Sequence, residues 1–129
     1  MNANSMDSGM PSESALEEEY LGILSAVEKG EKDKKSRLAW FMLSGRGGAN
    51  ADANQAVQIL EEQVKCKDAE AMWMLGLCKE YGIGTEEDIN AVDELYEQSS
   101  KGGSIAGKLF HCMRYENMRG SGVMRLRRL

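Results

Sequence analysis

The sequence predicts an all-α fold, an α/α superhelix (solenoid) of about six helices with two full repeats flanked by half repeats. The first observation is a repeated unit: Gly47 recurs as Gly84 after 37 residues, and Asp52 recurs as Asp88 after 36. The second is that glycines break each unit into two helix-like stretches. The third is that the chain contains a single proline. A period in the thirties is typical of helical-repeat arrays, because one helix pair cannot bury its apolar face alone.

Composition and charge narrow the class of protein. A length of 129 residues suits one domain, and 42% hydrophobic with 29% charged residues is typical of soluble globular proteins. The net charge of −5 argues against general nucleic-acid binding. No apolar run approaches the roughly 18 residues that span a bilayer, and the N-terminus has no signal-peptide pattern. Three cysteines without paired spacing favour free thiols, so we expect an intracellular, cytoplasmic protein.

The chain is predicted to begin with a disordered leader, residues 1–13, which is polar and contains the proline. The helical domain is expected over residues 14–119. Residues 14–17 have a capping-box pattern, which makes Ser14 the predicted N-cap of the first helix. Apolar side chains then recur at helical spacing as far as Gly30: Tyr20, Ile23, Leu24 and Val27. We interpret this helix as the second helix of a half-present earlier repeat.

Two full repeats are predicted over residues 34–67 and 68–103, each with two helices joined at a glycine turn. A last helix, beginning near Ser104, is interpreted as the first helix of a third unit. The stretch from Asn50 to Asp52 offers a cap for the second helix of the first repeat. Asp68 is the predicted N-cap of the following helix, and Thr85 or Asp88 that of the one after it.

Residues 120–129 are predicted to be a flexible basic tail. Its arginines Arg125, Arg127 and Arg128 are candidate contacts for an acidic partner, a nucleic acid or a membrane surface, or a localisation signal. The alternatives are a solvated tail and a linker to further chain.

The spacing of the repeated unit resembles that of the Sel-one-like repeat family, which is related to tetratricopeptide repeats. The second unit matches the family pattern at Leu75, Gly76, Gly82, Gly84, Asp88, Leu95, Tyr96, Ser99 and Ser100. The first unit matches it at Leu38, Ala39, Gly45, Gly47, Asp52, Ala56, Ile59 and Leu60. Ala39 stands for the usual glycine, and Lys79 and Thr85 replace the usual tyrosine and valine. The resemblance covers residues 34–113 and implies stacked helix pairs that mostly serve as protein-binding adaptors and scaffolds.

Small residues within the unit have a physical role that can be stated from the sequence. The small residue at position 39 or 76 is expected to let the partner helix approach closely. The two glycines of each unit make the turn between its helices. The small side chains of Ser99 and Ser100, at the end of the second helix, are expected to let the next repeat stack.

Five side chains on the first helices of the repeats are candidate partner-binding residues: Trp40, Leu43, Trp73, Leu77 and Glu80. The three on the later helix recur at i, i+4 and i+7, on a different stripe from Leu75 and Cys78. By similarity to tetratricopeptide-like arrays, this stripe faces the concave groove, where aromatic residues serve as anchors for a peptide. The alternative is that both tryptophans simply pack in the core.

No catalytic or metal site is predicted. His111 is the only histidine, and the neighbouring Cys112 diverges from it by about 100° around a helix. Cys66, Cys78, His111 and Cys112 have the residue types of a zinc set but lack the close ligand pairs of structural zinc sites. The glycines at 45–48 lack the phosphate-loop pattern. We therefore expect no enzyme activity and no cofactor.

The predicted function is a protein–protein interaction module, an adaptor or scaffold that binds a partner peptide or helix on the concave face of its stacked helix pairs. One alternative is a regulatory or targeting domain of a larger enzyme. Another is a self-associating structural domain, since two repeats fall short of the roughly three that such arrays need for stability.

Overall fold

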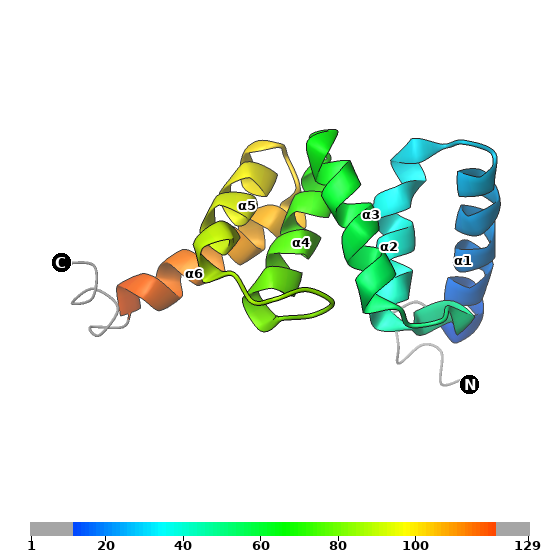
Figure 1. The fold of residues 1–129 in the computed structure, drawn as a ribbon, viewed down its shortest axis with the longest axis horizontal. Coiled ribbons are helices and arrows are strands. Elements are labelled where there is room, and N and C mark those ends of the chain that lie inside the picture. Colours follow the sequence, from blue (N-terminus) through cyan, green and yellow to red (C-terminus); the bar gives the residue numbers. More distant parts are fainter. Residues whose placement is uncertain (1–11, 121–129) are drawn as a thin grey trace, which may run out of the picture.

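The structure, a computed structural model, describes residues 12–120. Its helices are α1 (Glu13–Glu28), α2 (Lys35–Ser44), α3 (Ala53–Lys65), α4 (Ala69–Tyr81), α5 (Ile89–Lys101) and α6 (Ile105–Gly120), with the 3-10 turns η2 (Lys32–Lys34) and η3 (Arg46–Gly48). The α-helices follow one another along the long axis of the molecule (Figure 1). Helix α2 packs against α3, α4 against α5, and α5 against α6. The predicted all-α architecture of sequential helix pairs is confirmed.

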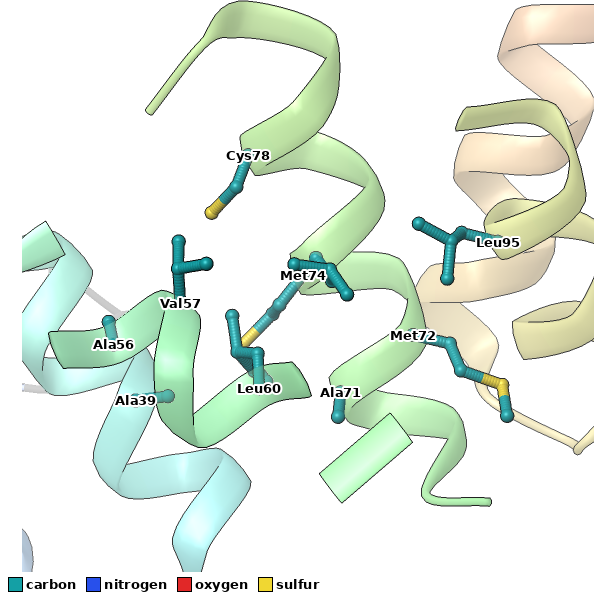
Figure 2. Packing of buried hydrophobic residues seen from close by; sticks show 10 residues of the cluster. Ala39, Ala56, Val57, Leu60, Ala71, Met72, Met74, Cys78 and Leu95 are labelled. Carbon is teal, nitrogen blue, oxygen red and sulfur yellow. The ribbon is translucent and has the colours of Figure 1, made fainter. Parts of the chain in front are cut away.

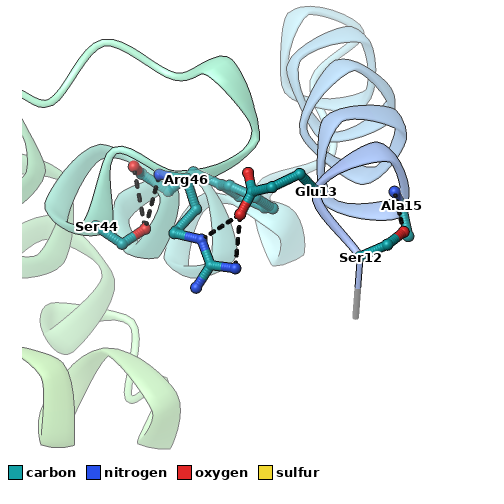
Figure 3. Close-up of polar contacts among 6 residues, drawn as sticks. Ser12, Glu13, Ala15, Ser44 and Arg46 are labelled. Atoms are coloured by element: carbon teal, nitrogen blue, oxygen red, sulfur yellow. Dashed lines mark hydrogen bonds and ion pairs between the residues drawn. The ribbon is translucent and has the colours of Figure 1, made fainter. Parts of the chain in front are cut away.

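Helix α1 begins earlier than the sequence predicted. Its N-cap is Ser12, whose hydroxyl accepts a hydrogen bond from the backbone N–H of Ala15 at 3.1 Å (Figure 3). The prediction of Ser14 as the cap is therefore wrong, because Ser12 already supplies the acceptor and Ser14 lies inside the helix. Glu13, in the first turn, accepts a hydrogen bond of 2.8 Å from Nε of Arg46. The rest of the predicted leader, residues 1–11, lies outside the described residues.

The caps of α3, α4 and α5 agree with the prediction, and α6 begins directly after Ser104, near which its start was predicted. Asp52, Asp68 and Ser104 each accept a backbone N–H of the following first turn at 3.0–3.1 Å. Of the two candidates before α5, Asp88 occupies the cap position. The side chains of Asp52, Asp68 and Ser104 favour the helix starts because they satisfy N–H groups that have no partner within the helix, whereas the side chain of Asp88 makes no cap hydrogen bond.

Two glycines mark the places where successive repeats approach each other. Gly47 and Gly84 have φ values of 64° and 70°. A Cβ atom on Gly47 would lie 2.7 Å from the carbonyl oxygen of Leu16 in α1, and one on Gly84 would meet the carbonyl oxygen of Ala53 in α3. Each glycine therefore brings the turn after a first helix against the start of the preceding second helix. The sequence predicted these glycines only as turn formers.

The predicted role of the small residues inside the helices is confirmed for Gly76 and Ser99. A Cβ atom on Gly76 would lie 2.7 Å from Cε1 of Tyr96, so glycine lets α4 and α5 approach closely. A Cβ atom on Gly107 of α6 would lie 2.6 Å from Cβ of Ser99. Ser99 is fully buried and donates a hydrogen bond of 2.7 Å to the carbonyl oxygen of Ala69. The small side chain at the end of α5 thus allows α6 to stack.

Two apolar clusters hold the helices together. The larger joins α2, α3, α4 and α5 through Ala39, Ala56, Val57, Leu60, Ala71, Met72, Met74, Leu75, Cys78 and Leu95. Figure 2 shows Leu60 of α3 facing Met74 of α4. The smaller lies between α1 and α2 and comprises Leu16, Ile23, Leu38, Phe41 and Ala49. Each fully buried large side chain, such as Phe41, stabilises the fold by roughly 1.5–3 kcal/mol. Helix α1 therefore covers α2 as the second helix of a preceding pair would.

Candidate functional site

A cleft of about 260 Å³ lies between the N-terminal halves of α2 and α4. Its lining residues are Asp33, Ser36, Arg37, Trp40, Asp68, Glu70, Trp73 and Met74. The walls of the cleft are therefore α2 and α4, the first helices of successive repeats. These two helices also touch each other directly. Two of the five predicted binding residues, Trp40 and Trp73, line this one cleft.

Trp40 is held on the α2 side of the cleft. Its side chain is half-buried and packs against both apolar clusters, with its ring edge-on to Phe41 at 4.9 Å between centroids. The guanidinium carbon of Arg37 lies 4.3 Å from the centroid of the Trp40 ring. Glu19 of α1 accepts hydrogen bonds of 2.7 and 3.0 Å from that guanidinium, and the bonds lower the pKa of Glu19. The orientation of Trp40 is thus set by α1 as well as by α2.

Trp73 is held on the α4 side and contacts both the interior and the cleft. Its Nε1 donates a hydrogen bond of 2.7 Å to the carboxylate of Glu70. Its ring stacks on Phe110 of α6, with centroids 5.2 Å apart and planes inclined by 16°. Phe110 in turn stacks on Tyr96 of α5 at 5.5 Å. Trp73 therefore stacks on the half-buried Phe110 of α6 and also lines the cleft, and its role in binding stays a prediction.

The other three predicted binding residues lie away from this cleft. Leu43 is half-buried and packs against the larger apolar cluster. Leu77 is also half-buried. The carboxylate of Glu80 accepts a hydrogen bond of 2.7 Å from the hydroxyl of Tyr96 and one of 3.2 Å from Arg114. By contrast, Leu75 and Cys78 of the same helix are buried, so the predicted separation of the two stripes on α4 is confirmed.

Glu80 is part of a polar network that joins α4, α5 and α6. Arg114 of α6 bonds to Glu80 of α4 and, at 2.6 Å, to Asp93 of α5. Burial alone would lower the pKa of the Arg114 guanidinium, but the hydrogen bond and charge of Asp93 and the charge of Glu80 raise it. Burial raises the pKa of Tyr96, and the hydrogen bond to Glu80 raises it further, so the phenol remains a donor. The network fixes α6, which carries Phe110, the support of Trp73.

The arrangement of helices has a counterpart among solved structures. A crystal structure of a Sel1 repeat protein from Oxalobacter formigenes matches with a TM-score of 0.59 and 28% sequence identity. This chain has a Sel1-like repeat fold. The match covers 69% of this chain and 66% of that one, so about a third of the other protein has no counterpart in the match. Comparison with protein-family models gives no match, and comparison with curated proteins gives none either.

The Sel1-like repeat fold is typically a protein-interaction module, and proteins with this fold are generally non-catalytic scaffolds. Within residues 12–120, no three His, Cys, Asp or Glu side chains are placed to hold a metal ion. In the same range no helix is both long and apolar enough to cross a membrane. The tail arginines Arg125, Arg127 and Arg128 lie outside the described residues.

The three cysteines of the Sel1-like repeat are free and lie in different environments. Cys66 and Cys112 are exposed, whereas Cys78 is buried in the larger apolar cluster. Burial raises the pKa of the Cys78 thiol to about 11, against a small opposing effect of the Lys79 charge. Cys78 is therefore a packing residue that remains protonated at neutral pH.

Sequence reasoning missed most of the polar residues that line the cleft of this Sel1-like repeat. Asp68 was recognised as a helix cap, but its second oxygen also accepts a hydrogen bond of 2.6 Å from the hydroxyl of Ser36, 32 residues away. No local pattern reveals such a pair. Glu70 and Trp73 lie at i and i+3 on one helix, so their contact was open to prediction from helical spacing.

Proposed function

We propose that the chain is a protein–protein interaction module that binds a partner's peptide or helix in the cleft between α2 and α4. The observation that supports this most is that Trp40 and Trp73, from successive repeats, line the same cleft. Tryptophan is enriched among the residues that dominate binding energy, because it buries a large area at a low cost in side-chain entropy. Both rings are already held by neighbours, which lowers the ordering cost on binding.

The same proposal places the protein inside the cell and assigns it no catalysis. Free cysteines, two of them exposed, suit a reducing compartment. The one hydroxyl that lines the cleft, that of Ser36, donates to the carboxylate of Asp68, and the histidine lies on α6. A hydroxyl bound to a carboxylate without a histidine base lacks the parts of a nucleophilic relay.

Peptide display on the full chain tests the proposal, with hits measured by fluorescence polarisation. Trp40→Ala and Trp73→Ala are each expected to weaken binding at least tenfold, because truncation of a hot-spot residue costs about 2 kcal/mol or more. Tyr81→Ala is the matched control, since Tyr81 is 65% exposed on α4 and does not line the cleft. Arg127→Ala is expected to have no effect either.

Far-UV circular dichroism must show that each variant is folded. If Trp73→Ala is not, Trp73→Phe keeps an aromatic ring against Phe110 while removing the indole N–H. Hits that bind folded Trp40 and Trp73 variants as tightly as the parent chain would place the binding surface elsewhere.

Self-association is a second candidate, and the outer face of α6 favours it. Ile105, Leu109 and Met113 recur every four residues and are 83%, 57% and 50% exposed. An apolar row of this kind on a helix suits a second copy of the chain. Light scattering over a range of concentrations separates the two functions: a dimer that Leu109→Glu dissociates would favour self-association. The role of a regulatory or targeting domain in a larger enzyme also stays a prediction.

A further inference from the structure

Resting on the proposed function, we propose that the cleft binds a basic segment of a partner protein and takes up one of its lysine or arginine side chains. The proposal starts from the size of the cleft. Its volume of about 260 Å³ lies just below the roughly 300–1,000 Å³ of small-molecule sites. A space of this size accommodates a side chain or two, which favours an extended segment over the whole face of a helix.

Carboxylates dominate the charge of the cleft. Asp33, Asp68 and Glu70 line it, against the single guanidinium of Arg37. That guanidinium is already engaged, since both oxygens of Glu19 accept its hydrogen bonds. Within the described part of the chain, none of the three lining carboxylates has an ion-pair partner. Lysines 32, 34 and 35 flank Asp33 in sequence but do not line the cleft.

Two of these carboxylates are held in place by hydrogen bonds. Asp68 accepts the hydroxyl of Ser36 with one oxygen at 2.6 Å and the backbone N–H of Glu70 with the other at 3.0 Å. Glu70 accepts the indole N–H of Trp73 at 2.7 Å. All of these donors are neutral, so they do not neutralise the negative charges of Asp68 and Glu70, which remain available to bind a cation. Fixed carboxylates lose little entropy when they bind a cation.

The aromatic walls suit the same ligand. The guanidinium of Arg37 over Trp40, 4.3 Å from the ring centroid, has the geometry of a cation–π contact within the chain itself. Trp73 lines the opposite wall, next to the carboxylate of Glu70. Aromatic rings beside carboxylates attract a cation and also pack against the apolar stem of a lysine or arginine side chain. Charge and shape therefore select a basic side chain over an acidic or an apolar one.

Nuclear magnetic resonance tests this inference, because the chain contains two tryptophans and so shows two indole N–H signals. Trp40→Phe and Trp73→Phe assign the signals. The probe is the peptide acetyl-Gly-Arg-Ser-Arg-Gly-amide, titrated into the full chain at low salt. Its addition is expected to shift both indole signals, and the same peptide with neutral citrulline in place of arginine is expected to bind at least tenfold more weakly.

The charge of the cleft is tested with Asp33→Asn combined with Glu70→Gln, which is expected to raise the Kd of the probe at least tenfold. Glutamine keeps an oxygen acceptor for Trp73, and Asp68 is left intact because it caps α4. Glu86→Gln combined with Glu87→Gln is the matched control. It changes the net charge equally, and these exposed residues lie in the turn before α5. It is expected to change the Kd less than twofold.

The outcomes that overturn the inference are distinct from those that overturn the proposed function. The inference that the occupant is basic is overturned if the arginine and citrulline peptides bind equally tightly. It is also overturned if both double variants lose the same affinity for the probe. A displayed neutral or acidic peptide that needs both tryptophans also overturns it and leaves the proposed function standing. If no peptide of any kind shifts the indole signals, both fail.

The chain's own tail is the remaining occupant to test. The triple variant Arg125→Ala/Arg127→Ala/Arg128→Ala tests it. If the indole signals and the Kd of the probe are unchanged in this variant, the occupant is a segment of a partner protein. If the indole signals shift and the probe binds at least tenfold more tightly, the tail occupies the cleft in the parent chain, and the proposal of a partner's segment is overturned.

Discussion

Gly84→Ala is expected to lower the free energy of unfolding by about 3 kcal/mol, whereas Gly82→Ala in the same turn is expected to cost about 1 kcal/mol. Both glycines have a left-handed backbone, with φ of 70° and 69°, so an L-residue carries a similar strain of about 1–2 kcal/mol at either position. The two positions differ in their surroundings. A Cβ atom on Gly84 would lie 2.7 Å from the carbonyl carbon of Ala53, while one on Gly82 would have no neighbour closer than 3.8 Å.

The extra cost at Gly84 comes from backbone that has to move, which typically adds about 1–3 kcal/mol. Urea unfolding followed by far-UV circular dichroism measures both variants. Gly47→Ala is expected to behave like Gly84→Ala, because its Cβ atom would lie 2.7 Å from the carbonyl oxygen of Leu16. Equal losses for Gly82→Ala and Gly84→Ala would show that the close approach between repeats contributes nothing beyond turn strain.

Arg114→Met is expected to lower the free energy of unfolding by about 2–3 kcal/mol, because it leaves Glu80 and Asp93 without their shared cation. The side chains of Arg114 and Glu80 are only 18% and 20% exposed, so water replaces the lost contacts poorly. The expected loss in free energy of unfolding is smaller than for a fully buried ion pair because the side chain of Asp93 is 47% exposed. Methionine keeps most of the length and apolar contact of the arginine stem.

Arg46→Met is the matched control for Arg114→Met. Arg46 also pairs with a carboxylate, but its side chain and that of Glu13 are 42% and 66% exposed, so the expected loss is below about 1 kcal/mol. Tryptophan fluorescence provides a second measurement, since loosening α6 frees Phe110 from Trp73. Similar losses in the two variants, or an unchanged emission spectrum of Arg114→Met, would contradict the proposed coupling of this network to the cleft.

The candidate site was predictable only in part. Spacing on one helix placed Trp73 on a different stripe from Cys78, and the structure agrees in their burial. The same spacing grouped Glu80 with Trp73, yet Glu80 bonds to Tyr96 and Arg114 while Trp73 lines the cleft. Helical periodicity assigns side chains to a face, but the stretch from Trp73 to Glu80 spans about two turns of helix, so its two ends meet different neighbours.

The sequence by itself determined where the helices lie and that they repeat. Aspartates at the helix starts and glycines at the ends act through hydrogen bonds and backbone angles within a few residues, so a local pattern suffices to predict them. The N-cap of α1 was predicted as Ser14 but is Ser12. Both are serines and both can cap a helix, so the local pattern did not distinguish them.

Only the tertiary structure decided how the repeats meet and which polar groups line the cleft. The bond from Ser36 to Asp68 and that from Arg114 to Glu80 join residues 32 and 34 positions apart. Likewise, the second glycine of the turn is required by the carbonyl group of Ala53 in another repeat. Such contacts depend on the distance between neighbouring helices, and that distance is set by packing over many residues and not by any local pattern.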